Sequence, residues 1–167
     1  MTEKEAISFN KENVYNGISK NGYGWTCFAK KDFKIGDKVV VGFGKVVDHQ
    51  TPRISIQIGF KKHYKPKKWT GRYWNHSCSP NTYIKTRSDG FLNLVALKNI
   101  KKGDEITFLY AMSEFEWIKN ADENHINCLC GEPNCKGKIL SFSQLSETEQ
   151  ITLRRNKTCS KYLLDMV

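Results

Sequence analysis

The sequence predicts a mostly β fold of several short sheets, with short helices towards the C-terminus. Segments in which apolar and polar residues alternate, or in which β-branched residues gather, are much more frequent than segments with a helical period. Turn-forming clusters separate them: Ile35-Gly36-Asp37, Ser88-Asp89-Gly90 and Lys102-Gly103-Asp104. A chain of 167 residues, of which 39% are hydrophobic, is long enough to bury one core. We therefore expect one domain.

Five segments have the composition and alternation of strands. They are residues 25–29, 38–42, 53–58, 92–97 and 105–110. Helix signals gather later, where Ser113 with Glu116 and Ser146 with Glu149 have the spacing of capping boxes. The segment after Lys138 is expected to form one or two helices that pack on the domain, or a surface for a partner. The first eleven or so residues are polar and are expected to fray.

Charge and hydropathy limit the class of protein. The sequence has no run of about 18 apolar residues, and its start lacks the pattern of a secretory signal, so we expect a soluble intracellular protein. The net charge of +10 and the Lys61–Lys68 cluster suit a nucleic-acid contact or a nuclear address. A solvated lysine-rich face explains the same charge, and both interpretations stay open.

The cysteine spacing predicts a metal site. Cys128, Cys130 and Cys135 form a C-x-C-x4-C cluster, which supplies three of the four ligands of a tetrahedral zinc ion. Three side chains compete for the fourth position: Cys78, His125 and Cys159. A reducing compartment favours zinc over disulfides. If Cys78 is the ligand, Cys27 and Cys159 are left as buried thiols.

Three further segments precede this cluster. They are Asn21-Gly22-Tyr23-Gly24-Trp25, Arg72-Tyr73-Trp74-Asn75-His76-Ser77-Cys78 and Gly103-Asp104-Glu105-Ile106-Thr107-Phe108-Leu109-Tyr110. Together with the cysteine cluster, in this order, they resemble the SET-domain protein lysine methyltransferases that carry a post-SET zinc segment. The resemblance covers roughly residues 13 to 140. It implies a SET domain (13–112) and a post-SET zinc segment (113–140). The residues outside it are expected to form a flexible N-terminal extension (1–12) and a C-terminal helical extension (141–167).

The resemblance implies a β-clip-like fold in which the Asn-His segment is threaded as a knot-like element, a rare arrangement. It also implies that S-adenosylmethionine binds one face and that the target lysine enters through a narrow channel from the other. The implied cofactor-binding residues are Tyr23, Gly24, Trp25, Arg72, Asn75, His76 and Leu129. Without the resemblance, the Gly22-Tyr23-Gly24 segment would be interpreted as an ordinary turn. A single histidine such as His76 more often has a structural role than a ligand-binding one.

Tyr110 matches the family's catalytic tyrosine, whose hydroxyl orients the lysine amine. Phe108 occupies the position two residues earlier, which in this family often tunes how many methyl groups are added; phenylalanine there favours di- or trimethylation. A purely structural role of Phe108 in the core stays open. Trp25 and Tyr83 are further candidates for the walls of a dry channel.

The resemblance favours Cys78 as the fourth ligand, so that Cys78, Cys128, Cys130 and Cys135 form a closed structural site without a position for catalysis. The chain departs from the family at Leu109, Thr26 and Trp74, where an aspartate, a glycine and a smaller apolar residue or phenylalanine are usual. The insert between about Lys45 and Trp69, which helps to choose the substrate, is short.

Two functions are consistent with these patterns. The first is an S-adenosylmethionine-dependent protein-lysine N-methyltransferase acting on a histone tail or another protein, with possible DNA contact through the basic face and, in a eukaryote, a nuclear location. The second is a catalytically silent, zinc-stabilised SET module that binds chromatin or nucleic acid. Retention of Asn75, His76 and Tyr110 favours the first, because a binding module has no need of all three.

Overall fold

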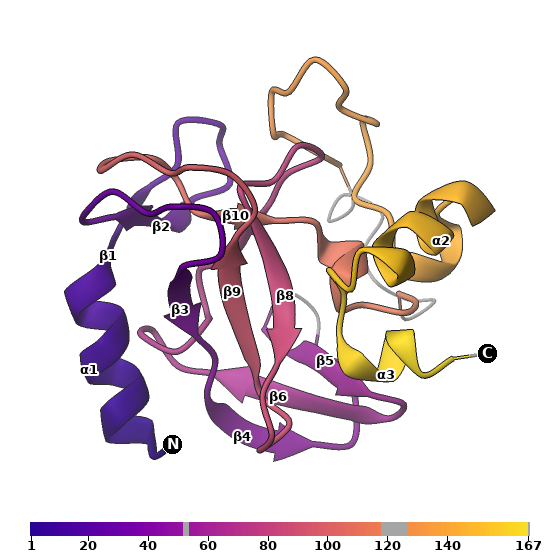
Figure 1. Cartoon of the computed structure of the whole chain (residues 1–167), viewed down its shortest axis with the longest axis horizontal. Helices are drawn as coiled ribbons and strands as arrows, with labels where there is room; N and C mark the ends of the chain where they lie inside the picture. The colour runs from indigo at the N-terminus through magenta and orange to yellow at the C-terminus, as the bar shows by residue number, and fades with distance from the viewer. Residues whose placement is uncertain (52–53, 118–126, 167) are drawn as a thin grey trace.

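The computed structural model describes residues 1–51, 54–117 and 127–166. Most of its regular structure is short β-strands arranged in four small sheets (Figure 1). The strands are β1 (Val14–Ile18), β2 (Trp25–Ala29), β3 (Lys38–Val41), β4 (Gly44–Val47), β5 (Ile56–Gly59), β6 (Lys62–Pro66), β7 (Asn75–His76), β8 (Thr82–Thr86), β9 (Leu92–Ala96) and β10 (Thr107–Phe108). The mostly β prediction is confirmed.

The described residues form few helices, and all of them are short. They are α1 (Glu3–Asn13), α2 (Glu147–Arg155), α3 (Lys161–Leu164) and the 3-10 turns η1 (Tyr110–Met112) and η3 (Phe142–Gln144). Figure 1 shows α1 on one side of the sheets and α2 and α3 on the opposite side. No helix in the described ranges is long and apolar enough to span a membrane.

Three sheets are antiparallel. β1 pairs with β2, β9 lies between β3 and β8, and β6 lies between β4 and β5. The core gathers against the β3-β9-β8 sheet, where Val40, Ile84 and Leu94 are fully buried. β9 is buried along its whole length, which explains why its apolar run was recognisable in the sequence.

The remaining pair is parallel and positions the site. β7 pairs with β10 so that Asn75 lies opposite Thr107 and His76 lies opposite Phe108. Asn81 holds the same junction, because its Nδ2 donates to the Glu105 carbonyl at 2.7 Å and its Oδ1 accepts from the Thr107 N–H at 2.9 Å. Two segments about thirty residues apart in sequence are thereby fixed side by side. The knot-like threading stays a prediction.

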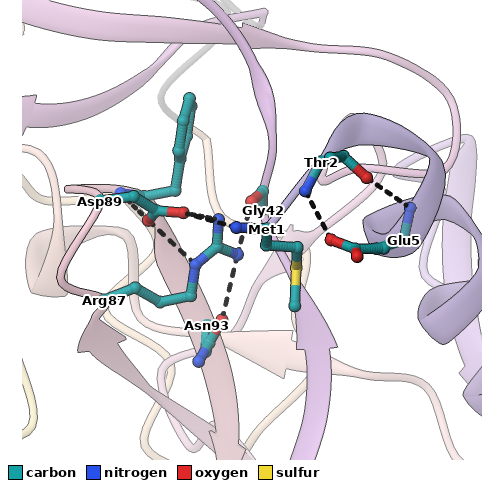
Figure 2. A network of polar contacts seen from close by, with 8 residues as sticks. Met1, Thr2, Glu5, Gly42, Arg87, Asp89 and Asn93 are labelled. Atoms are coloured by element: carbon teal, nitrogen blue, oxygen red, sulfur yellow. Dashed lines mark hydrogen bonds and ion pairs between the residues drawn. The ribbon is translucent and has the colours of Figure 1, made fainter.

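The N-terminus corrects the sequence prediction. The first residues were expected to fray, but α1 begins with a capping box in which Thr2 and Glu5 cap each other (Figure 2). Asn10 is only 2% exposed and pairs with both the N–H and the C=O of Val41 at 2.8 Å. The buried stripe consists of Ala6, Asn10 and Asn13, which are too small or polar to register as apolar periodicity.

An ionic network lies next to the start of the chain. Figure 2 shows the Arg87 guanidinium, which forms a bidentate pair with Asp89 at 2.7 and 3.0 Å and donates to the Gly42 carbonyl at 2.9 Å. The Met1 amino group lies 3.9 Å from the Asp89 carboxylate. These contacts tie the N-terminus to the turn between β8 and β9.

Other element boundaries also differ from the expectations. The Ser146–Glu149 capping box is confirmed at the start of α2. The Ser113–Glu116 box is wrong, because Ser113 ends η1 and residues 114–117 are not helical. The strand expected at 53–58 is β5, from residue 56; position 53 lies outside the described residues. The segment 105–110 contains only a two-residue strand, while Glu105 forms an isolated bridge to Phe28. The sequence prediction missed β1, β4, β6, β7 and β8.

The C-terminal segment packs on the domain. The Ser160 N–H donates to the Met112 carbonyl at 2.7 Å, and Tyr162 donates to the Ser113 carbonyl. Leu163 is fully buried in the core. This segment therefore supports the chain that follows Tyr110, which agrees with the first of the two expectations for residues after 138.

Candidate active site and metal centre

Two cavities with shared lining residues lie near the β7–β10 junction. The large cavity, of about 590 Å³, is lined by Gly22, Tyr23, Trp25, Arg72, Tyr73, Asn75, Tyr110, Asn127, Leu129 and Ile139. The small cavity, of about 80 Å³, is lined by Ile54, Ser55, Ile56, Gly71, Arg72, Trp74, Phe108, Tyr110, Glu114 and Trp117. Arg72 and Tyr110 line both cavities.

The large cavity collects most of the predicted cofactor-binding residues. Tyr23 lies in the turn before β2 and Trp25 is the first residue of β2. Asn75 comes from β7, and Leu129 lies between two of the clustered cysteines. Asn75 donates from Nδ2 to the Trp25 carbonyl at 3.2 Å. The Trp25 ring stacks on Tyr73 with centroids 5.9 Å apart. The wall therefore combines aromatic faces with a few polar groups, as is usual for small-molecule sites.

Gly24 and His76 do not line either cavity. Gly24 has φ +80°, a conformation that a glycine adopts without strain, and a Cβ there would meet nothing within 4 Å. Its carbonyl accepts from the Ser19 N–H at 2.8 Å. The requirement for glycine at this position thus comes from the turn itself.

His76 is 1% exposed and its ring serves contacts inside the protein. Its Nδ1 accepts from the Tyr110 N–H at 3.2 Å, so the neutral ring carries its proton on Nε2, which lies 3.5 Å from the Cys78 sulfur. Burial lowers the pKa of His76 to about 4. A neutral imidazole therefore joins Tyr110 to the cysteine cluster.

Tyr110 is the first residue of η1, two residues after the end of β10. Its hydroxyl donates to the Trp74 carbonyl at 3.0 Å. Burial raises the pKa of Tyr110 well above its usual value, so the hydroxyl stays protonated. The Phe108 ring is buried, with its centroid 5.0 Å from that of Tyr110 and 6.4 Å from that of Trp74. These three rings enclose an apolar space.

The predicted cysteines come together. The sulfur atoms of Cys78, Cys128, Cys130 and Cys135 all lie within 4.8 Å of one another, and those of Cys78 and Cys128 are 3.8 Å apart. At a Zn–S distance of about 2.3 Å, tetrahedral ligands are separated by about 3.8 Å. The donor set therefore fits Zn²⁺. Cys27 and Cys159 are buried thiols outside this cluster, as predicted, and position 125 lies outside the described residues.

Tyr23 connects the cysteine cluster to the large cavity. Its hydroxyl accepts from the Leu129 N–H at 2.8 Å and lies 3.3 Å from the Cys128 sulfur. The hydroxyl proton is therefore free to point at that sulfur. Asn21 adds a bond from Nδ2 to the Cys130 carbonyl at 3.1 Å. The chain that surrounds the metal position also forms a wall of the cavity.

Several lining residues were not predicted from the sequence. Ile56, Trp74, Glu114 and Trp117 line the small cavity, and Tyr73 lines the large one. Tyr83, a candidate wall residue, lies on β8 and lines neither cavity. A possible signal for Glu114 was a carboxylate placed among apolar residues just after Tyr110.

Comparison with known proteins identifies the family. A family model for the SET domain matches residues 24–111. The chain belongs to the SET domain family. This family match includes β2, β7 and β10, the three strands that position the candidate site.

The chain is similar to curated fungal proteins. It is 28% identical over 154 residues to a histone-lysine N-methyltransferase, H3 lysine-36 specific, of Yarrowia lipolytica, which covers 81% of this chain and 19% of the relative. It is 26% identical over 153 residues to a histone-lysine N-methyltransferase, H3 lysine-4 specific, of Aspergillus oryzae. That match covers 80% of this chain and 12% of the relative. These matches therefore span less than a fifth of each relative.

A solved structure agrees in fold. The crystal structure of KRYPTONITE in complex with mCHH DNA, an H3(1–15) peptide and SAH superimposes with a TM-score of 0.61 at 22% identity. The match covers 77% of this chain and 29% of that one. The arrangement of small sheets is thus that of a SET-domain protein.

Proposed function

We propose that this chain is an S-adenosylmethionine-dependent protein-lysine N-methyltransferase whose substrate is a histone. The observation that carries the proposal is that Tyr110 and Arg72 line both cavities, so a cofactor and a side chain that enter from different sides would meet at Tyr110. The named activities of the curated relatives support the reaction, and their H3 substrates support a histone target. A nuclear location follows from such a target.

The large cavity suits the cofactor in size and chemistry. Its volume lies within the range of about 300–1,000 Å³ typical of ligand sites. S-adenosylmethionine, when bound, supplies a methyl group on a positively charged sulfur. Trp25 and Leu129 offer apolar contact, and the Asn75 amide offers hydrogen bonds to the amino-acid part. Arg72 offers a positive charge for the carboxylate of the cofactor.

The small cavity suits the target lysine. An amine must lose its proton before it attacks a methyl group, which for a lysine of pKa near 10.4 costs about 4–5 kcal/mol at pH 7. The rings of Trp74, Phe108 and Tyr110 exclude water and so disfavour the ammonium form at the reacting end. The Tyr110 hydroxyl would orient the amine, which is a positioning role. The apolar Phe108 supports di- or trimethylation.

The four clustered cysteines would hold Zn²⁺ as a structural ion. All four corners are supplied by the protein, which leaves no position for a substrate. The contacts of Tyr23 with Cys128 and Leu129 make the metal site part of the cofactor wall. We therefore assign the metal to the scaffold and the reaction to Tyr110.

The test is methyl transfer from labelled S-adenosylmethionine to free histones, nucleosomes and a cell lysate, preceded by calorimetry of cofactor binding. We expect Tyr110→Phe to bind the cofactor normally and to reduce kcat by about 10²–10³-fold, because an oriented hydroxyl is lost. A wild-type protein that binds no cofactor but binds DNA or nucleosomes would instead support the silent module. Tyr15→Phe, at an exposed position on β1, is the control.

A further inference from the structure

One of the residues that line the small cavity is an acidic residue, Glu114. Glu114 is 5% exposed and follows Tyr110 by one turn, since its N–H donates to the Tyr110 carbonyl at 2.9 Å. Most of the other lining side chains are apolar or aromatic, among them Ile56, Phe108 and Trp117. A buried charge in such surroundings is costly unless it is compensated.

The hydrogen-bond partners of Glu114 are neutral. Its Oε1 accepts from the Gln57 N–H at 2.9 Å and from the Ser113 hydroxyl at 3.2 Å, while Oε2 accepts from Gln50 Nε2 at 3.1 Å. No ion pair recorded among the described residues includes Glu114. A carboxylate oxygen can accept two hydrogen bonds, so Oε2 has capacity for a further donor.

Among the described residues that line the small cavity, Glu114 is the only acidic one. Arg72, the other charged lining residue, reaches the cavity from the segment before β7. The titratable groups packed nearby are the phenols of Tyr64 on β6, Tyr110 on η1 and Tyr162 on α3; burial raises the pKa of each, so all three are uncharged. Burial also raises the pKa of Glu114 to about 7, so it is partly ionised at neutral pH.

The position of Glu114 is held from several sides. Gln57 donates to its carboxylate and accepts from the Phe115 N–H at 2.8 Å, which fixes the chain to β5. The Phe142 N–H of η3 donates to the Glu114 carbonyl at 2.8 Å. The side chain of this lining residue is thus held in one position, and no cation among the described residues forms an ion pair with it. A ligand cation would supply that compensation.

We propose that Glu114 pairs with the ammonium group of the target lysine within the small cavity and so makes the cavity selective for a cationic side chain. This inference rests on the proposed function, because it takes the small cavity as the lysine channel. An arriving ammonium would donate to Oε2 on entry and would offset the cost of the buried charge. It then leaves this pair and loses its proton to water, and the neutral amine attacks beside Tyr110. Glu114 is then a specificity-determining residue, while Tyr110 orients the amine for transfer.

The test is a binding cycle that needs no turnover. Nα-acetyl-lysine methylamide and Nα-acetyl-norleucine methylamide, which differ in the ammonium group, are titrated into the full chain with and without S-adenosylhomocysteine. Binding is followed by NMR of the indole N–H groups of Trp74 and Trp117, which line the cavity. We expect the wild-type preference for lysine over norleucine to fall about tenfold or more in Glu114→Gln. Glu116→Gln, the same change at an exposed residue two positions on, should retain it.

Equal lysine preference in the wild type and Glu114→Gln would overturn the proposal. If Glu114→Gln fails to fold, the wild-type protein alone tests the proposal. Its preference for the lysine ligand over the norleucine ligand should be about tenfold larger at pH 8.5 than at pH 5.5, because the Glu114 carboxyl is protonated at the lower pH. A preference that does not change with pH overturns the proposal. Methyl transfer without a Glu114-dependent preference would refute only this inference. A Glu114-dependent preference without methyl transfer would refute only the proposed activity.

Discussion

At the scale of single residues, Phe108 predicts how many methyl groups the product lysine receives. Its apolar ring faces Tyr110 and Trp74 in the small cavity, where a tyrosine hydroxyl would hold a water molecule or the amine itself. We expect the wild type to form di- or trimethyl-lysine and Phe108→Tyr to stop at monomethyl-lysine, as measured by mass spectrometry of the product. Phe60→Tyr, at an exposed ring, should leave the product unchanged. A wild-type enzyme that stops at one methyl group would contradict the prediction.

Glu114 also predicts a pH dependence of stability. Its pKa of about 7 in the folded protein lies above the ordinary value of 4.5, so the folded state binds the proton more tightly than the unfolded state. The stabilisation of the folded state by this tighter proton binding is complete below pH 4.5 and is lost as the pH rises through 7. We expect the unfolding free energy of the wild type, relative to Glu114→Gln, to fall by about 3 kcal/mol between pH 4.5 and pH 8.

Urea unfolding of both proteins across this pH range measures the difference. Glu116→Gln serves as the reference for a change of the same type at an exposed position. A wild-type stability that differs from that of Glu114→Gln by the same amount at every pH would show that the carboxyl is not perturbed by burial.

At the scale of elements, Asn10 fixes α1 to the edge of β3. Its amide satisfies the N–H and C=O of Val41 and donates to the Trp69 carbonyl at 2.5 Å. Asn10→Ala leaves these buried backbone groups without a partner, so we expect a loss of about 2–4 kcal/mol in unfolding free energy. Ser8→Ala, on the exposed face of the same helix, should change stability by less than about 0.5 kcal/mol. Equal effects of the two changes would contradict a structural role for α1.

At the scale of the whole molecule, the metal site and the large cavity form one unit through Tyr23. Removing zinc with a chelator should weaken binding of S-adenosylhomocysteine as well as lower the melting temperature, because Leu129 and Tyr23 are held by the cysteine cluster. Tyr23→Phe should reduce zinc affinity by about 10–100-fold, since the hydroxyl contacts a ligand sulfur. Calorimetry of both ligands measures this coupling. Unchanged cofactor affinity after zinc removal would disprove it.

The sequence predicted those elements of the fold that depend on residues close together in the chain. The buried runs of β3 and β9 and the capping box of α2 were recognisable because burial and capping depend on neighbouring residues. The helix α1 was missed because its buried stripe is small and polar. The two-residue strands β7 and β10 have no periodicity to detect, since their pairing depends on distant segments. The Ser113–Glu116 pair had the spacing of a cap, but the contacts of Ser113 and Glu114 with β5 and the C-terminal segment hold that chain in another conformation.

The sequence by itself determined the residue types of the site: the cysteine spacing, the Asn-His segment and the tyrosine after a short apolar run. These are properties of residues close together in the chain. Only the tertiary structure decided which of them face one space. It brought Cys78 to the other three cysteines, turned the His76 ring away from the large cavity and towards Tyr110 and Cys78, and placed Glu114 in the small cavity. The physical reason is that a cavity is enclosed by side chains from distant segments, whose packing no local pattern encodes.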